Sequence, residues 1–312
     1  MTTTPSSTAR REPAEALGRS LAELTNDPDA FTAALRRGLA ALSDPEYLEG
    51  QRRVAPGIGA LHGVRWPLLA AVDRGFRRET KGDRPTPILL IAGRLFREAE
   101  LESRWFAFGL LERTLASETE RTWQLLRRAA REAGDWITVD SLAHPYGTGI
   151  AQEPYRWAEL EQLIYSPSRW ERRLVGSTIA TMTHGGRKTG RDPRLPQQAL
   201  ALLAQLMGDA EPDVQKALSW AYRSLAQLYW EPTATALAAE TDLATAGSDG
   251  HRAWVIRDSL SKLDPGVADQ LRERLAGIRK RPGAGPTSRA SEVSSRFGSL
   301  PDPSVHPDPL FT

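Results

Sequence analysis

The sequence of 312 residues contains no cysteine, and this absence excludes several kinds of chemistry at once. Without thiols the chain can form no disulfide, thiolate zinc site or iron–sulfur cluster, and it has no cysteine nucleophile. Only five histidines are present, and none is spaced as HxH or HxxxH, the arrangements that pair imidazoles at common metal sites. The sequence therefore predicts no metal and no other cofactor, and it is typical of a reducing compartment.

Long apolar runs are missing as well. No stretch approaches the roughly 20 apolar residues of a transmembrane helix, and the first dozen residues lack the apolar centre of a signal peptide. We therefore expect a soluble, cytoplasmic protein without a membrane partner, associated with the nucleoid if the source is bacterial. The formal net charge is only +2, from 41 Lys+Arg and 39 Asp+Glu. Affinity for a polyanion would thus require basic residues gathered on one face.

The sequence does contain apolar residues that recur every three or four positions. In 29–42, Phe31, Leu35, Leu39 and Leu42 form one stripe, which predicts an amphipathic helix. Similar patterns predict helices at 64–79, 86–98, 101–116, 118–133, 154–165, 168–182, 195–207, 211–229 and 266–279. Strand-like alternation is nearly absent, so the predicted fold class is all-α. An irregular bundle and a solenoid both fit, and a spacing of roughly 35–45 residues between helix pairs favours HEAT-like hairpin repeats.

The two ends differ in composition from this helical body. Residues 1–13 lack the apolar periodicity, and 281–312 are rich in Pro, Gly and Ser but poor in large aliphatic side chains. Such segments bury too little apolar surface to offset the entropy that ordering would remove. We therefore expect one helical domain over 14–280, between a disordered N-terminal extension and a disordered C-terminal tail.

Three clusters combine aromatic and charged side chains at helical spacing. In the first, GDWITVDSL (134–142), Trp136 and Asp140 are four residues apart and share one face of a helix. A carboxylate beside an aromatic wall can stabilise a developing cation. The alternative is structural: Asp140 would cap a short helix and Trp136 would belong to the core.

The second cluster is SPSRWERR (166–173), which begins with a capping-box pattern at Ser168 and Glu171. This pattern starts a helix and places Arg172 and Arg173 in its first turn. The two guanidinium groups could bind phosphate there, assisted by the free backbone N–H groups of the turn. In the alternative, one of them pairs with a neighbouring acid in a solvated first turn.

The third cluster places Lys216, Trp220 and Arg223 at positions i, i+4 and i+7 of a helix, opposite Leu218 and Leu225. A stripe of two cations and an indole suits a nucleic-acid backbone with a sugar or base against the ring. Taken alone, however, a tryptophan on a helix is more often part of a core.

Between the second and third clusters lies a glycine-rich segment, THGGRKTGRDPR (183–194), which carries Arg187 and Lys188. It contains neither GxxxxGK[ST] nor GxGxxG, so it matches no common nucleotide-binding motif. We predict a loop here, either a basic flap that contacts DNA or a solvated connection.

In this order, the clusters resemble the AlkD-like DNA alkylation repair family, which are HEAT-like-repeat alkylpurine DNA glycosylases. The matching segments span roughly 50–275 and are HGVRWPLLAAV (62–72), WITVDSLA (136–143), SPSRWERR (166–173) and QKALSWAYR (215–223). The resemblance implies a curved solenoid with a concave DNA-binding face. It implies that Asp140 is the catalytic aspartate and that Trp136 and Trp220 pack against the lesion and its sugar. Arg173 matches the arginine of the same region.

One carboxylate with two tryptophans suits the hydrolysis of a glycosidic bond that alkylation of the base has already weakened. A purine alkylated at N3 or N7 is cationic, so its glycosidic bond breaks without a strong general acid, and one carboxylate can stabilise the resulting sugar cation. We expect a monomeric, monofunctional DNA N-glycosylase of base excision repair that acts on duplex DNA without a Schiff-base lysine. The expected DNA-binding residues are Arg172, Arg173, Arg187, Lys188, Lys216 and Arg223.

The sequence departs from the family at Ile137, where relatives often have an acidic residue, and after Arg173, where no further basic residue follows in the helix. Two other classes of function therefore stay open. One is a HEAT-like protein that binds distorted or branched DNA without cleaving it. The other is a HEAT scaffold for protein partners.

Overall fold

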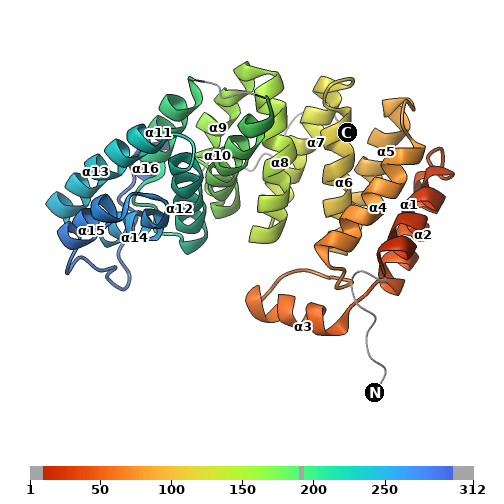
Figure 1. Cartoon of the computed structure of the whole chain (residues 1–312), viewed down its shortest axis with the longest axis horizontal. Helices are drawn as coiled ribbons and strands as arrows, with labels where there is room; N and C mark the ends of the chain where they lie inside the picture. Colours follow the sequence, from red (N-terminus) through yellow and green to blue (C-terminus); the bar gives the residue numbers. More distant parts are fainter. Residues whose placement is uncertain (1–9, 190–192, 298–312) are drawn as a thin grey trace. The chain divides into compact units, whose positions relative to one another are not determined.

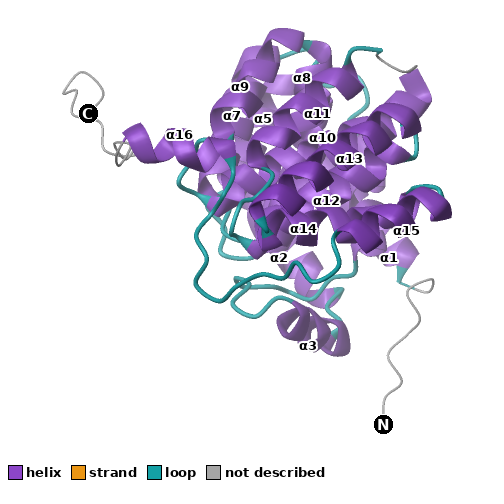
Figure 2. Cartoon of the chain, turned by 90° about the vertical axis from the view of Figure 1, so that its left-hand side faces the viewer, coloured by secondary structure: helices purple, strands orange, loops and turns teal. Residues whose placement is uncertain are grey.

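The computed structural model describes residues 10–189 and 193–297, with side chains for 10–183 and 193–296. These residues form sixteen α-helices and two short 3₁₀ helices, and the only strand-like pairing among them is an isolated bridge between Ala60 and Glu100 (Figures 1 and 2). The predicted all-α fold class is confirmed. No helix in the described part is both long and apolar enough to span a membrane.

The chain divides after Tyr155 into two compact units. The described part of the first unit contains α1 (Arg11–Ala22), α2 (Pro28–Ala41), α3 (Pro45–Val54), α4 (Trp66–Glu79), α5 (Pro85–Leu95), α6 (Leu101–Thr114), α7 (Thr119–Glu132) and α8 (Trp136–Gln152). Helices α1, α4, α6 and α8 pack one on the next as one row, while α2, α5 and α7 form a second row. Helix α3 lies apart from both rows and has no buried residue.

The apolar stripe predicted in 29–42 forms part of the core of this unit. Phe31, Leu35 and Leu39 of α2 are all 0% exposed. The ring of Phe31 contacts Phe76 of α4 and Phe106 of α6, at centroid distances of 5.5 and 6.3 Å. The two rows of the first unit are therefore joined by an aromatic cluster.

Two glycines bring α1 and α4 into backbone contact. A Cβ atom on Gly18 would lie 2.0 Å from the carbonyl oxygen of Val72, and one on Gly75 would lie 2.1 Å from that of Glu15. Both distances are far below van der Waals contact, so a larger residue at either position would force the helices apart.

The second unit repeats the two-row arrangement. Its helices are α9 (Trp157–Leu163), α10 (Arg169–Thr189), α11 (Leu195–Leu206), α12 (Pro212–Ala226), α13 (Trp230–Gly247), α14 (Gly250–Ser259), α15 (Pro265–Arg274) and α16 (Arg289–Phe297), with a 3₁₀ helix at Leu260–Lys262 (η2). The other 3₁₀ helix, Pro154–Arg156 (η1), contains the point at which the chain divides. Helices α10, α12 and α14 form one row, α11, α13 and α15 form the other, and α16 packs on α11. Stacked helical hairpins in each unit agree with the HEAT-like arrangement. The curvature, the concave DNA-binding face and the joining of these helices into a single domain stay predictions.

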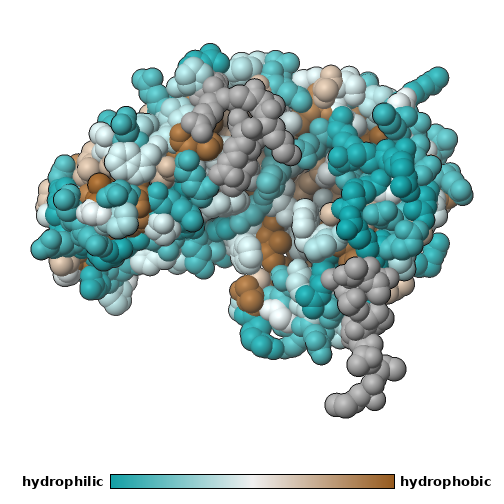
Figure 3. Space-filling model, in the orientation of Figure 1, coloured by the Kyte–Doolittle hydropathy of each residue, from teal (hydrophilic) through white to brown (hydrophobic). Residues whose placement is uncertain are grey.

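The exposed surface carries no extended apolar area in the view of Figure 3, where hydrophobic residues form small, separate spots. The exposed large apolar residues of the described chain are spread over α3, α4, α5, η1 and α13: Val54, Trp66, Leu90, Tyr155, Trp230 and Leu243. Single apolar residues of this kind are ordinary on protein surfaces and do not indicate a docking site.

Two boundaries predicted from the sequence are wrong. Helix α1 begins at Arg11, and the Arg10 side chain donates to the carbonyls of Leu42 and Ser43 at 3.3 and 2.9 Å, so order begins before residue 14. Helix α10 continues to Thr189, so most of the glycine-rich segment is helical and not a loop. An established helix extends at little cost, and each glycine opposes it by only about 1 kcal/mol.

The disorder predicted for 281–312 does not hold in the part of this segment that the structure describes. Ser288 and Ala290 are each 1% exposed, and Arg289–Phe297 forms α16. The N–H of Thr287 donates to the carbonyl of Gly208 at 2.9 Å, and its hydroxyl donates to the Asp249 carboxylate. Hydrogen bonds and small side chains hold this segment. Its composition, poor in large aliphatic side chains, therefore wrongly predicted disorder for this part. Residues 298–312 lie outside the described part.

Truncation after Pro282 should lower the stability of the protein. It removes the hydrogen bond from Thr287 to the charged Asp249, worth about 2 kcal/mol, together with the burial of Ala290. We expect the melting temperature to fall by about 4–8 °C in thermal unfolding. A chain that ends after Phe297 is the comparison, and equal melting temperatures for the two truncated chains would contradict a stabilising role for 283–297.

A buried carboxylate organises the segment HGVRW. Glu102, at the start of α6, is 1% exposed and accepts the backbone N–H groups of His62, Gly63 and Val64 at 3.0, 2.8 and 3.2 Å. Three donors aimed at one carboxylate satisfy a buried charge that would otherwise be unfavourable. The residues before α4 are thus fixed by a side chain about 40 positions further along the chain.

Glu102→Gln should destabilise the protein by about 2–3 kcal/mol, because a neutral amide places N–H groups against backbone N–H donors. The measurement is the midpoint of denaturant unfolding. Glu100→Gln is the matched control, since Glu100 precedes the same helix and its side chain makes no cap hydrogen bond. A similar loss in both variants would contradict a specific role for Glu102.

Candidate nucleic-acid interface

The start of α8 is fixed by Asp135 and not by Asp140. The Asp135 carboxylate accepts the N–H and the hydroxyl of Thr138 at 2.8 and 2.6 Å, and the Thr138 hydroxyl accepts the indole N–H of Trp105 at 3.1 Å. Helix α8 then runs for 17 residues. The alternative in which Asp140 caps a short helix is therefore wrong.

Trp136 and Asp140 lie one turn apart on α8, and both are half-buried. The core-facing residues of this helix are Val139 and Leu142, at 1% and 0% exposure. Trp136 is therefore not enclosed in the core, and its side of α8 combines an indole with a carboxylate at the edge of solvent. The spacing of these two residues predicted this arrangement correctly.

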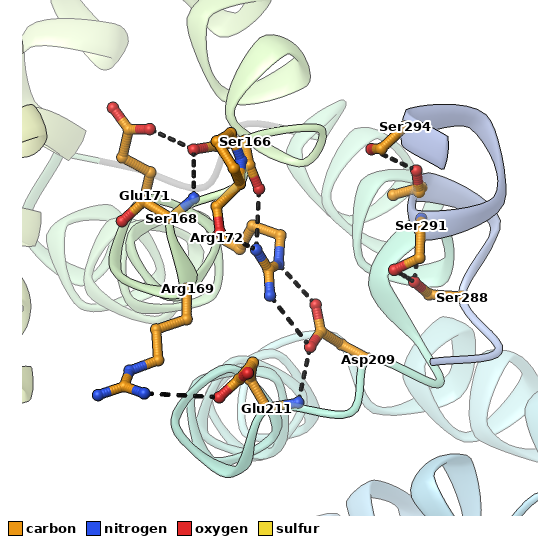
Figure 4. Close-up of polar contacts among 12 residues, drawn as sticks. Ser166, Ser168, Arg169, Glu171, Arg172, Asp209, Glu211, Ser288, Ser291 and Ser294 are labelled. Carbon is orange, nitrogen blue, oxygen red and sulfur yellow. Dashed lines mark hydrogen bonds and ion pairs between the residues drawn. The ribbon is translucent and has the colours of Figure 1, made fainter. Parts of the chain in front are cut away.

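Arg172, at the start of α10, is held by neighbours within the second unit (Figure 4). Its Nε lies 2.7 Å from Oδ2 of Asp209, and its Nη1 donates to the carbonyls of Ser166 and Pro167 at 2.8 and 3.1 Å. The Arg172 side chain is 14% exposed and that of Asp209 only 1%. Arg172 thus pairs with an acid, as the structural alternative expected, but in a buried and not a solvated position.

The expected capping box is modified by Ser166 (Figure 4). The N–H of Ser168 donates to the Ser166 hydroxyl at 3.0 Å, and that hydroxyl donates to the Glu171 carboxylate. The Ser166 hydroxyl therefore bridges the N–H of Ser168 and the carboxylate of Glu171, which a capping box would pair directly. The helix still begins where the pattern predicted, with Arg169 as its first residue.

Arg173 joins the first turns of two neighbouring helices. It is 5% exposed, and its Nη1 donates to the carbonyl of Asp213 in α12 at 2.7 Å. One turn further along, a Cβ atom on Gly176 would lie 2.8 Å from the carbonyl carbon of Ala217, so the backbones of α10 and α12 touch. The stretch after Arg173 lacks basic residues because it packs on α12.

The stripe predicted on α12 faces away from the core. Leu218 and Leu225 are 0% exposed, whereas Lys216 is exposed and Trp220 and Arg223 are half-buried. The sequence thus predicted the two sides of this helix correctly. Trp220 is not enclosed in the core, so its indole has a surface that a ligand can contact.

Asp258 of α14 is a charged neighbour of this stripe that the sequence reasoning missed. Its carboxylate accepts the Ser219 hydroxyl at 2.5 Å and Nη1 of Arg223 at 2.6 Å. Burial alone would raise the pKa of Asp258, but these hydrogen bonds and the nearby charge of Lys216 lower it below its ordinary value. Asp258 is therefore ionised at neutral pH and neutralises Arg223. The available signal was the spacing of Trp254 and Asp258, which repeats that of Trp136 and Asp140.

The remaining predicted DNA-binding residues, Arg187 and Lys188, belong to the last turns of α10, but their side chains lie outside the described part. Among the side chains that the structure does describe, no three His, Asp or Glu residues gather as a metal site would require. The functional roles assigned to the nine site residues stay predictions.

Comparison with known families gives a match over most of the chain. The model of a family described as DNA alkylation repair enzyme matches residues 35–263, which include all three clusters and most of the chain. A search among curated proteins finds no match.

Arg172→Ala should reduce stability, because it leaves the carboxylate of Asp209 buried without its cation. We expect a loss of about 3 kcal/mol in denaturant unfolding. Arg169→Ala is the matched control: this side chain is 48% exposed, and its carboxylate partners are 3.7 and 3.8 Å away, so it should cost about 1 kcal/mol or less. If Arg172→Ala unfolded like the wild type but bound DNA more weakly, the structural role assigned to Arg172 would be wrong.

Proposed function

Because this chain belongs to the DNA alkylation repair enzyme family, we propose that it is a monofunctional DNA glycosylase that removes purines alkylated at N3 or N7 from duplex DNA. The observation that carries this proposal is the family match, which includes the side of α8 where Trp136 and Asp140 lie together at the edge of solvent.

In the proposed reaction the C1′–N bond of the alkylated nucleotide breaks and its electron pair neutralises the cationic purine. The sugar is left as an oxocarbenium ion, which the carboxylate of Asp140 stabilises electrostatically. Water then adds its oxygen to C1′ and releases a proton to the solvent. No lysine is needed as a nucleophile, so the product is an abasic site and not a cleaved strand.

The two tryptophans bind the nucleotide in this proposal, as the family resemblance implies. Electron-rich indole faces attract cations, which favours the alkylated base and the developing sugar cation over an ordinary nucleotide. Trp136 and Trp220 are each half-buried, so each has both a fixed position and an exposed part.

Contact with the DNA backbone favours cations that are not held by carboxylates or backbone carbonyls of the protein. Of the residues predicted for this role, Arg172, Arg173 and Arg223 donate to carboxylates or carbonyls of the protein, whereas Lys216 is exposed. Phosphate contacts of this kind are independent of base sequence and weaken with salt, since binding releases counterions from the DNA. Lys216 is the best supported of the proposed DNA contacts.

Asp140→Asn tests the enzymatic part of the proposal. The substitution keeps the size of the side chain but removes its charge, so excision of methylated purines should fall by about 10²–10³-fold while affinity for DNA is kept. Release of free bases from methylated duplex DNA, followed by chromatography, measures the rate. Asp269→Asn, at an exposed position on α15, is the control and should excise like the wild type.

Two results would overturn this assignment. If the wild type binds duplex DNA but releases no base, a non-catalytic protein for distorted or branched DNA becomes the better account. If Asp140→Asn remains fully active, Asp140 is not the catalytic carboxylate, although the family membership stands.

A further inference from the structure

The chain continues past the family-matched range, and residues 279–288, here called the C-terminal strap, return to the second unit. The strap passes the start of α14 at Gly250, where an added Cβ atom would lie 2.2 Å from the carbonyl oxygen of Arg279. The carbonyl of Ala284 lies 3.1 Å from Nε2 of His251, and Thr287 bonds Asp249. Backbone contact at one end and hydrogen bonds further along therefore fix its path.

This path places Lys280 beside the basic stripe of α12. The Nζ atom of Lys280 donates to Oε1 of Gln215, the residue before Lys216, and lies 4.3 Å from the ring centroid of Trp254. Burial and the positive charge of Lys216 both lower the pKa of Lys280. The two ammonium groups are thus close enough to repel each other.

A buried amide holds Lys280 in this position. Gln215 is 0% exposed, and its side-chain nitrogen donates to the carbonyl of Asp209 at 2.5 Å and lies 3.1 Å from Nδ1 of His251. These contacts turn the amide oxygen of Gln215 toward Lys280. The hydrogen bond and the indole beneath the ammonium group restrict the lysine side chain before any ligand arrives, which reduces the entropy that binding must remove.

The charges around this lysine are not balanced. Asp258 is the carboxylate that acts on the stripe, and it already forms an ion pair with Arg223 at 2.6 Å. Across the described chain, neither Lys216 nor Lys280 makes an ion pair of its own. Lys216 is exposed and Lys280 is half-buried. Two cations that repel each other and have no ion-pair partner of their own favour an anionic ligand.

We propose that Lys280 is a contact for the DNA backbone, carried by the C-terminal strap to the stripe of Lys216 and Trp220. This inference rests on the proposed function, because it takes duplex DNA as the anion. Neighbouring indoles and point-like ammonium groups suit a phosphodiester chain, in which phosphates alternate with apolar sugar faces. Lys280 lies outside the family-matched range, so the contact is a feature of this chain's own C-terminal segment.

The test is the salt dependence of binding to unmodified duplex DNA, measured by fluorescence anisotropy with the full chain. Loss of one phosphate contact should reduce the slope of log Kd against log salt by about 0.9. We expect this reduction for Lys280→Gln. Lys81→Gln, which removes an exposed lysine of the first unit, should keep the wild-type slope.

A second variant moves the strap without removing a charge. Gly250→Ala places a methyl group against the backbone of Arg279 and should displace Lys280, so the slope should fall as it does in Lys280→Gln. Gly247→Ala is the matched control, since an added Cβ atom there meets nothing within 4 Å. Thermal unfolding of both variants shows whether the unit remains folded.

The outcomes separate this inference from the proposed function. If the wild type binds DNA and excises bases but Lys280→Gln keeps the wild-type slope, the inference is wrong and the glycosylase stands. If the slope falls in Lys280→Gln while the wild type releases no base, the contact stands and the glycosylase is wrong. If the wild type does not bind duplex DNA, both are wrong.

Discussion

Backbone contact between successive helices of a row is the constraint that places the side chains around it. A helical hairpin cannot cover its own apolar stripe, so each one must pack on the next. Gly18 and Gly75 allow this contact between α1 and α4, and Gly176 allows it between α10 and α12. At the second crossing the touching backbones bring Arg173 within 2.7 Å of the Asp213 carbonyl and set the direction in which α12 presents its stripe.

Arginine serves the fold of this chain both where the sequence suggests DNA binding, as at Arg172, and where it does not, as at Arg252. Arg172 neutralises the buried Asp209, and Arg252 bonds the buried Glu240 and the carbonyl of Met207. Burial raises the pKa of Glu240, and the adjacent Arg252 opposes that shift. Because a planar guanidinium can satisfy a carboxylate and a carbonyl together, arginine suits such buried positions better than lysine does. Clustered arginines therefore do not by themselves mark a DNA-binding face.

The helices that the sequence predicted well have aliphatic stripes, as α2 does. Helix α13 (Trp230–Gly247) had no such signal, because its buried positions are mostly small or polar: Thr233, Leu237, Glu240, Thr241 and Ala244. They follow helical spacing, but threonine and glutamate carry little hydrophobic contrast. Helix α16 and the strap were missed for a related reason, since hydrogen bonds such as that from Thr287 to Asp249 depend on residues 38 positions apart. Composition describes what a segment can bury and not which partner it meets.

The candidate site was predictable where its members share a helix and unpredictable where they do not. Trp136 and Asp140, or Lys216 and Trp220, are placed by helical spacing alone. Lys280 reaches Gln215 from 65 residues away, through a backbone path that Gly250 allows.

In our proposal, the use of arginine within the fold and of lysine for DNA contact has a functional consequence. Arginines read guanine through a planar fork, whereas an ammonium group is a point charge without that geometry. A protein that holds Arg172, Arg173 and Arg223 with its own carboxylates and carbonyls and offers Lys216 and Lys280 to the backbone would bind DNA of any sequence. Damage to a purine can occur in any sequence context, so contacts that ignore the neighbouring bases leave recognition to the charge of the lesion itself.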